Sequence, residues 1–245
     1  MDELYEALVN AKHAVCFTGA GVSTLSGIKD FRSADGVYSK PWQGYSVESI
    51  LSLSFFNNNP SIFYQWSKEF CYCLDRFEPN IVHKTVAELQ KRGIIKALIT
   101  QNIDLLHTKA GSPEVVEIHG SPAKHHCLKC RKIYTYDEIA PRVMRDEVPK
   151  CDCGGIIKPD IVFYEESLHA EDLDRSFEEA GRSDLFLVLG SSLTVQPAAS
   201  LPLEALQHHA KICIVNAQPT YLDRFAQWKF DDLKVVFEYI ENHLK

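Results

Sequence analysis

The sequence lacks the features that would place the protein in a membrane, in a secretory pathway or on nucleic acid. No apolar stretch approaches the roughly 20 residues that a membrane span needs. The N-terminal region has acids and no basic segment before an apolar run, so we expect no secretory signal and a cytoplasmic protein. The formal net charge is -7, which argues against a broad basic surface and stable binding to nucleic acid.

Internal repeats and low-complexity segments are also missing, and the cysteines do not suggest a disulfide framework. The length of 245 residues fits one large domain, or one domain with a sizeable insertion. All eight thiols should be reduced in a cytoplasmic protein. Half of them lie in apolar runs, where we expect buried core thiols; these are Cys16, Cys71, Cys73 and Cys213.

Short apolar runs alternate with segments of helical periodicity. The runs, rich in branched residues and typical of buried parallel strands, are 14–17, 94–99, 115–118, 184–189 and 211–215. The helical segments are 2–12, 81–92, 170–181 and 198–209. This alternation predicts an α/β fold with a doubly wound, Rossmann-like parallel sheet.

Two stretches interrupt this rhythm and read as insertions. Residues 38–80 are aromatic-rich and mostly helical, with a helix start at Asn59-Pro60, while residues 121–158 carry no buried-strand signal. We therefore predict three parts, namely a Rossmann-like domain (1–37, 93–120 and 159–245), a helical insertion with a cofactor loop (38–92) and a small metal-binding module (121–158).

The remaining cysteines have the spacing of a zinc site. They form a C-x-x-C pair and, after twenty residues, a C-x-C pair followed by two glycines; the four are Cys127, Cys130, Cys151 and Cys153. Four thiolates suit tetrahedral Zn²⁺, although two spacer residues are common in the second pair. A ligand exchanged for His125 or His126, or four unliganded thiols, are the alternatives.

The segment GAGVSTLSGIKDFR, residues 19–32, follows the first apolar run directly. A strand that enters a glycine-rich turn and then a helix is a phosphate-binding arrangement. The dinucleotide fingerprint is incomplete because Thr24 stands at its third glycine, so a plain strand-to-helix turn is the alternative. The tail adds a carboxylate, an aromatic ring and a guanidinium at Asp30, Phe31 and Arg32.

Polar side chains follow two further runs, where ligands bind in sheets of this kind. Asn102 and Asp104 come after the run 94–99, and together they can satisfy a carboxamide such as that of nicotinamide. The alternative is a capped helix start. His119 follows the run 115–118 and is a candidate general base, with a structural histidine as the alternative.

In this order and spacing the motifs resemble the signature of the sirtuin family. That family has a GAG-S-SGI-DFR loop, a TQNID segment followed by Leu-His, a His-Gly pair and two cysteine pairs, all of which have counterparts here. Residues 158–163, 190–197 and 215–220 resemble its substrate strand, second nucleotide loop and adenine-ribose segment. The resemblance covers essentially the whole chain.

The resemblance implies NAD-dependent removal of acetyl or other neutral acyl groups from protein lysine. The products would be nicotinamide, free lysine and O-acetyl-ADP-ribose, with His119 as the base, a structural zinc, acetylated proteins or peptides as partners and a monomeric enzyme. Val162 and Phe163 would lie beside the acyl-lysine. The implied NAD contacts are Gly19, Ala20, Gly21, Ser23, Thr24, Asp30, Phe31, Arg32, Gln101, Asn102, Ile103, Asp104, Gly190, Ser191, Ser192 and Asn216.

Two residues depart from the family pattern, and three other function classes are alternatives. Lys29 stands where the family usually has proline, and Glu165 where many members have glycine. A protein ADP-ribosyltransferase would share every NAD residue. A non-catalytic sensor of NAD metabolites would be expected to lose His119 or Asp104, and both are present. A dehydrogenase is disfavoured by the incomplete glycine fingerprint.

The helix after Asn59-Pro60 carries information on the acyl group. Sirtuins that prefer succinyl or malonyl lysine have a Tyr-x-x-Arg pair there, whereas this sequence has Tyr64 and Ser67. Burying a carboxylate without a cationic partner is unfavourable, and this sequence has Ser67 in place of the arginine. We therefore expect a pocket that accepts neutral acyl groups, with Tyr64 in its lining. The alternatives are that Tyr64 is a core residue and that Lys68 supplies the charge.

Overall fold

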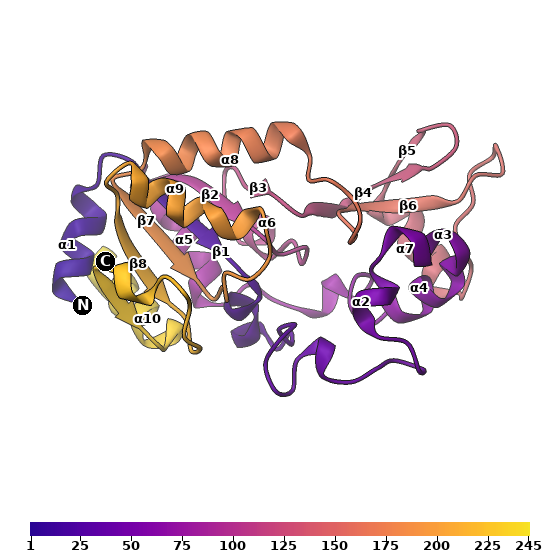
Figure 1. Cartoon of the computed structure of the whole chain (residues 1–245), viewed down its shortest axis with the longest axis horizontal. Coiled ribbons are helices and arrows are strands. Elements are labelled where there is room, and N and C mark those ends of the chain that lie inside the picture. The colour runs from indigo at the N-terminus through magenta and orange to yellow at the C-terminus, as the bar shows by residue number, and fades with distance from the viewer.

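The larger of the two lobes in Figure 1 is a parallel sheet with helices on both faces. The structure, a computed structural model, describes residues 1–245. The six strands lie in the order β3-β2-β1-β7-β8-β9. Their bounds are β1 Ala14–Thr18, β2 Ile95–Thr100, β3 Val116–Glu117, β7 Leu185–Leu189, β8 Lys211–Val215 and β9 Trp228–Phe230. The five predicted strands and the α/β class are confirmed, and the short edge strand β9 was not predicted.

Burial on both faces explains why the central strands were readable from the sequence. Every residue of β1 and β7 is buried, and side chains alternate between two apolar cores. The core beneath α1, α5 and α10 contains Cys16, and the core beneath α8 and α9 contains Val15 and Phe17. These helices span α1 Asp2–Asn10, α5 Ile81–Lys91, α8 Ala170–Arg182, α9 Leu201–Gln207 and α10 Leu233–Leu244.

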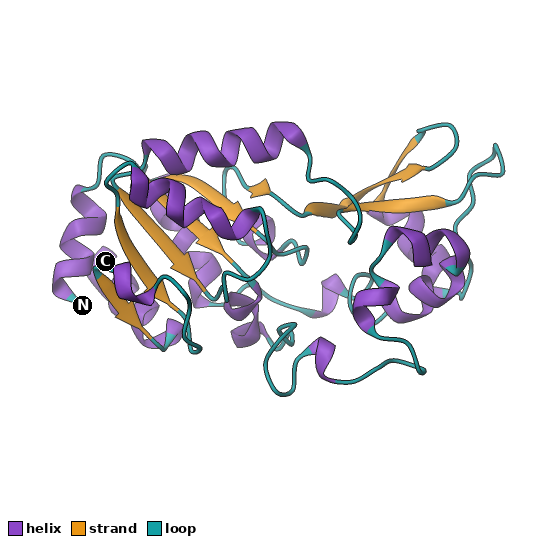
Figure 2. Ribbon diagram, in the orientation of Figure 1, coloured by secondary structure: helices purple, strands orange, loops and turns teal.

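The smaller lobe combines an antiparallel sheet with short helices (Figure 2). Its strands pair in the order β5-β4-β6, with bounds β4 Gly120–Cys127, β5 Ile133–Thr135 and β6 Ile157–Ile161. Its helices are α2 Val47–Ile50, α3 Leu53–Asn58, α4 Pro60–Ser67 and α7 Tyr136–Met144. One apolar core includes residues of both predicted insertions, among them Phe63 and Ile139. The insertions therefore share a core, and β6 crosses the predicted boundary at residue 159.

The strands β4 and β5 of this lobe were not predicted because only part of each strand is buried. Burial along β4 is irregular, and β5 buries one residue of three, so neither has a continuous apolar run. The remaining elements are short: α6 Leu106–Lys109 and the 3₁₀ turns η1 Ala20–Ser26, η2 Val37–Ser39, η3 Leu74–Arg76, η4 Ala198–Ser200 and η5 Asp223–Phe225. None of the helices has the length and apolarity to cross a membrane.

Candidate active site

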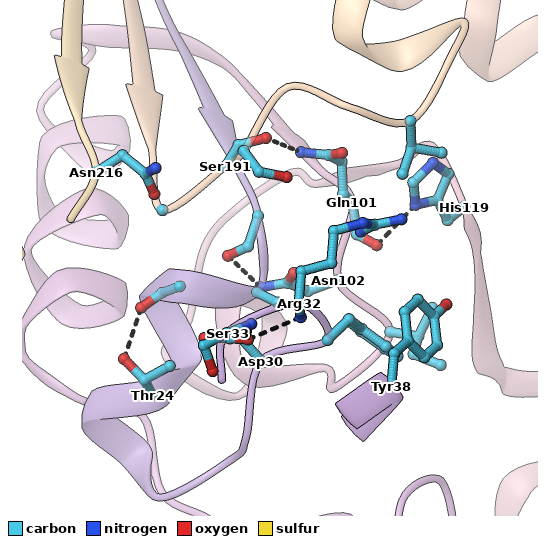
Figure 3. A pocket seen from close by; sticks show the side chains of 18 of the residues that line it. Thr24, Asp30, Arg32, Ser33, Tyr38, Gln101, Asn102, His119, Ser191 and Asn216 are labelled. Atoms are coloured by element: carbon cyan, nitrogen blue, oxygen red, sulfur yellow. Dashed lines mark hydrogen bonds between the residues drawn. The ribbon is translucent and has the colours of Figure 1, made fainter. Parts of the chain in front are cut away.

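A cleft of about 630 Å³ lies at the carboxyl ends of the parallel strands. It is lined by the segments that follow β1, β2, β7 and β8, and by residues 161–166 of the smaller lobe. This is the position at which open α/β sheets bind ligands, and the volume suits a molecule of cofactor size. Figure 3 shows polar side chains from these segments converging on the cleft.

Glycines allow the loops after β1 and β7 to touch at the cleft floor. The backbone N of Gly21 donates to the carbonyl O of Gly190 at 2.8 Å. A Cβ on Gly190 would lie 2.4 Å from the backbone N of Val22, and its φ of +60° also favours glycine. A Cβ on Gly19 would lie 2.7 Å from the same carbonyl O. This close backbone approach leaves room for a phosphate group beside the turn.

Side chains after β2 tie the nucleotide loops together. Gln101 Nε2 donates to Ser191 Oγ at 2.8 Å, and Asn102 Nδ2 donates to the carbonyl O of Gly19 at 3.1 Å and to Ser23 Oγ at 3.2 Å. Gln101 and Asn102 both line the cleft. Because three loops are cross-linked here, the geometry of this end of the cleft is set before any ligand binds.

Asp104 and Ser23 differ from the expectation because they lie behind the cleft lining. Asp104 Oδ2 accepts from Ser23 Oγ at 2.6 Å, and Oδ1 accepts from the backbone N of Leu106, the first residue of α6, at 2.9 Å. Burial raises the pKa of Asp104, while these hydrogen bonds lower it. The carboxylate thus holds the start of a helix and braces Ser23, which in turn accepts from Asn102. Neither residue is among the cleft lining.

His119 presents one ring nitrogen to the cleft. Its Nδ1 donates to the carbonyl O of Gln101 at 3.0 Å, which assigns the proton to Nδ1 and leaves Nε2 as the acceptor (Figure 3). Burial lowers the pKa of His119, and the positive charge of Arg32 lowers it further, while the Gln101 contact raises it. The imidazole is therefore neutral near pH 7 and ready to take a proton.

The residues after η1 form a compact turn over one side of the cleft. Asp30 Oδ1 accepts from the backbone N of Arg32 at 2.9 Å and of Ser33 at 2.7 Å. Asp30, Phe31 and Arg32 all line the cleft, as predicted for this motif. The remaining predicted residues that also line it are Gly19, Ala20, Gly21, Thr24, Gln101, Asn102, Ile103, His119, Val162, Phe163, Gly190, Ser191, Ser192 and Asn216.

Tyr64 lies outside the cleft, contrary to the expectation for the acyl pocket. It is buried in the smaller core, and its hydroxyl donates to the carbonyl O of Ile157. Ser67 is also buried, and Lys68 pairs with Asp146 at 2.5 Å instead of pointing to the cleft. The core-residue alternative therefore describes Tyr64. The helix that contains Tyr64 was predicted correctly, but the direction in which its side chain faces was not.

The smaller lobe contributes an apolar wall. Leu51, Ile161 and Phe163 line the cleft from this side, where the only charged lining residues are Glu165 and Glu166. The backbone N of Val162 donates to the carbonyl O of His119 at 2.8 Å, which fixes this wall beside the imidazole. No sequence motif singled out Leu51, Tyr38 or Tyr164, since single apolar or aromatic residues in loops carry no periodic signal.

The four clustered thiols have the geometry of a tetrahedral metal site. Their Sγ atoms lie within 4.8 Å of one another, with 3.5 Å between Cys127 and Cys153 and between Cys130 and Cys151. Zn–S bonds of about 2.3 Å require S···S distances of roughly 3.8 Å. A Cβ on Gly155 would lie 2.6 Å from Cys127 Sγ, so the turn needs glycine to accommodate the thiolate.

The neighbouring histidines do not replace a thiol. His125 Nε2 lies 2.7 Å from Tyr72 Oη, and His126 Nδ1 lies 3.4 Å from Asp160 Oδ1. The group of side chains that could hold one ion consists of the four cysteines alone. These residues fit a Zn²⁺ ion held by four thiolates.

Comparisons with known proteins agree with this site. The Sir2 family model matches residues 19–197. "NAD-dependent protein deacylase 2" of Archaeoglobus fulgidus is 46% identical over 220 residues, covering 89% of this chain and 85% of the relative. "NAD-dependent protein deacetylase" of Thermotoga maritima is 40% identical over 232 residues, covering 94% and 92%.

Solved structures give the same answer. Sir2 with a p53 peptide and NAD+ superimposes with a TM-score of 0.88 at 38% identity, covering 100% of this chain and 97% of that one. Sir2 with a deacetylated p53 peptide and 3'-O-acetyl-ADP-ribose gives a TM-score of 0.91 at 37% identity, with the same coverage. The chain therefore belongs to the Sir2 family, the sirtuins.

Proposed function

We propose that this protein uses NAD to remove acetyl and other neutral acyl groups from lysine side chains of proteins. The observation that carries the proposal is His119, whose Nδ1–H is committed to the Gln101 carbonyl while Nε2 faces the cleft. A neutral base in this position lies between the glycine-lined floor and the apolar wall, which are suited to a dinucleotide and to an acyl-lysine respectively.

The residues of the cleft perform three tasks. Gly19, Gly21 and Gly190 bring backbone close to the pyrophosphate, and Asn102 orients the nicotinamide end. When bound, NAD supplies the ADP-ribosyl group, which loses nicotinamide and accepts the acyl group. His119 Nε2 accepts the proton of a ribose hydroxyl, which makes that oxygen the nucleophile toward the acyl carbon. Most of the remaining rate enhancement comes from positioning and the exclusion of water.

The observed contacts give Asp104 and Ser23 an indirect part in cofactor binding. Asp104 and Ser23 act on the nicotinamide end through Asn102, because they lie one layer behind it. Gln101 and Ile103 serve the nicotinamide end together with Asn102. Gly190, Ser191, Ser192 and Asn216 serve the adenosine side of the cofactor, and Val162 and Phe163 border the acyl-lysine. The four cysteines hold a structural zinc in the smaller lobe.

Mass spectrometry of the products is the direct test. With NAD and an acetyl-lysine peptide we expect equal amounts of nicotinamide, deacetylated peptide and O-acetyl-ADP-ribose. A peptide that gains the mass of ADP-ribose would instead identify an ADP-ribosyltransferase. Binding of NAD without turnover of any acyl peptide would identify a sensor, and either result would overturn the proposal.

Acyl preference should follow charge. The cleft residues from the smaller lobe include no lysine or arginine, so a succinyl carboxylate would be buried beside Glu165 and Glu166 without a partner. We expect turnover of a succinyl-lysine peptide to be on the order of 100-fold slower than that of the acetyl peptide. A butyryl peptide, similar in length but neutral, is the matched control for size. Succinyl turnover equal to butyryl turnover would contradict the charge argument.

The pH dependence should report on His119. Because burial and the charge of Arg32 hold its pKa below the ordinary value of 6.5, the imidazole stays neutral as the pH falls from 8 toward 6.5. Activity is lost only when the pH falls through the lowered pKa and Nε2 becomes protonated. A profile of kcat/KM between about pH 5 and 8 should have its acid midpoint below 6.5. A midpoint above that value would point to another base.

The proposal includes a cytoplasmic, monomeric enzyme that acts on acetylated proteins. None of the eight cysteines forms a disulfide, which supports action in a reducing compartment.

A further inference from the structure

Residues 29–45 connect η1 of the larger lobe to α2 of the smaller lobe (Figure 1). This segment, here called the cofactor loop, is bonded mainly to itself. The backbone N of Val37 donates to the carbonyl O of Asp30 at 2.8 Å, and that of Tyr38 donates to the carbonyl O of Phe31 at 3.0 Å. It therefore has an internally defined shape, and its place over the cleft depends on what ties it to the rest of the molecule.

One hydrogen bond joins the cofactor loop to another part of the molecule. Tyr38 Oη lies 2.9 Å from Tyr164 Oη, across 126 positions of sequence, and both tyrosines line the cleft. No charged side chain of the loop forms an ion pair. Apolar contacts of Val37, Tyr38 and Trp42 with the smaller core, and an edge-to-face contact of the Tyr45 ring with Phe55, also hold the second half of the loop against the smaller lobe. The hydrogen bond between the two hydroxyls is the polar contact that fixes the Tyr38 side chain relative to the smaller lobe.

The backbone of Tyr164 is held by hydrogen bonds through both its N–H and its carbonyl. Its backbone N donates to the carbonyl O of Leu51 at 2.9 Å, and its carbonyl O accepts from the backbone N of Leu53 at 3.1 Å. The next residue, Glu165, accepts from the backbone N and Oγ of Ser54 at 2.8 and 2.9 Å, with a φ of +76° that side chains seldom adopt. The backbone at Tyr164 is thus fixed on the smaller lobe, and its exposed side chain reaches Tyr38 of the loop.

The ring of Tyr38 passes this restraint to the cofactor side chains. Its centroid lies 5.2 Å from that of Phe31 and 5.4 Å from Arg32 Cζ (Figure 3 shows Arg32 and Tyr38). Arg32 is also close enough to His119 to lower the pKa of the imidazole. The placement of one ring therefore influences two NAD-facing side chains and the field at the base.

We propose that Tyr164 is a positioning residue whose hydroxyl, through Tyr38, holds the cofactor loop in the arrangement that receives NAD. The kinetic part of this inference rests on the proposed function. If the hydroxyl is removed, the competent arrangement becomes less populated, and apparent NAD affinity falls by the same factor. Saturating NAD restores that arrangement, so kcat should change little.

Tyr164→Phe removes one oxygen and keeps the ring. We expect it to raise the KM for NAD about 2- to 10-fold, the range for one neutral hydrogen bond, with kcat nearly unchanged. Amide exchange at residues 30–40 of the ligand-free protein should accelerate by a similar factor. Tyr38→Phe should do the same, and the double variant should be no worse than either single one, because both remove one bond.

Tyr5→Phe is the matched control, since Tyr5 Oη donates to the carbonyl O of His243 at 2.7 Å, away from the cleft. It should leave the KM for NAD and loop exchange unchanged. Unchanged KM and exchange in Tyr164→Phe would overturn the inference, as would effects of the two cleft variants that multiply. If the wild type does not consume NAD, the proposed function fails, and the exchange measurement alone still decides whether the hydroxyl pair holds the loop.

Discussion

Replacing His119 by alanine should reduce deacetylation by about 10²–10⁴-fold, the range for loss of a general base. The imidazole is the only ring among the cleft residues with a free nitrogen acceptor, because Nδ1–H is committed to Gln101. The carboxylates of the cleft cannot take over easily. Glu166 already holds Lys158 at 2.8 Å and the backbone N of Phe163 at 2.8 Å.

The loss should fall on one step and spare cofactor binding. No cross-link among the nucleotide loops runs through the His119 side chain, so NAD binding measured by calorimetry should stay close to wild type. In the proposed mechanism nicotinamide leaves before the base acts, so exchange of labelled nicotinamide should persist in the presence of acetyl peptide. His208→Ala, at an exposed position directly after α9 and outside the cleft lining, is the control for histidine removal. Unchanged turnover in His119→Ala would mean that the base is misassigned.

The sequence was most informative where a strand is covered on both faces. The β1 and β7 strands appear as continuous apolar runs because every residue is buried, and the polar residues that follow them mark the cleft. In β5, by contrast, one residue of three is buried, and such a strand has the composition of a loop. A small sheet stabilised by a metal and by helices leaves little periodic signal.

Side-chain direction and distant pairing limited the prediction of the site. Asp104 carries the right group at the right strand end, yet its two oxygens are used by Ser23 and Leu106 behind the lining. Tyr64 was placed in the right helix but faces the core. The pairing of Tyr38 with Tyr164 depends on the packing of two lobes, which no local pattern encodes.

Loss of the metal should destabilise the smaller lobe strongly. We expect about one Zn²⁺ per chain by elemental analysis, since four thiolates within 4.8 Å repel one another unless a cation lies between them. Structural zinc contributes about 10–16 kcal/mol of apparent binding free energy in small peptides, so even partial loss is large on the scale of a domain. Removal by a chelator should lower the Tm by about 10 °C or more.

The Cys130→Ser variant distinguishes the effect of losing the metal from the effect of losing packing. Cys130 is the exposed ligand, so exchanging sulfur for oxygen costs little burial, and a large drop in Tm would report the lost zinc bond. Asp152→Ser, at an exposed side chain between the other two ligands, should leave Tm and zinc content unchanged. Activity should fall with the zinc, because Cys127 and Cys151 share one apolar core with Ile161 and Phe163 of the cleft wall. A metal-free protein with unchanged Tm and activity would refute both the site and its link to the cleft.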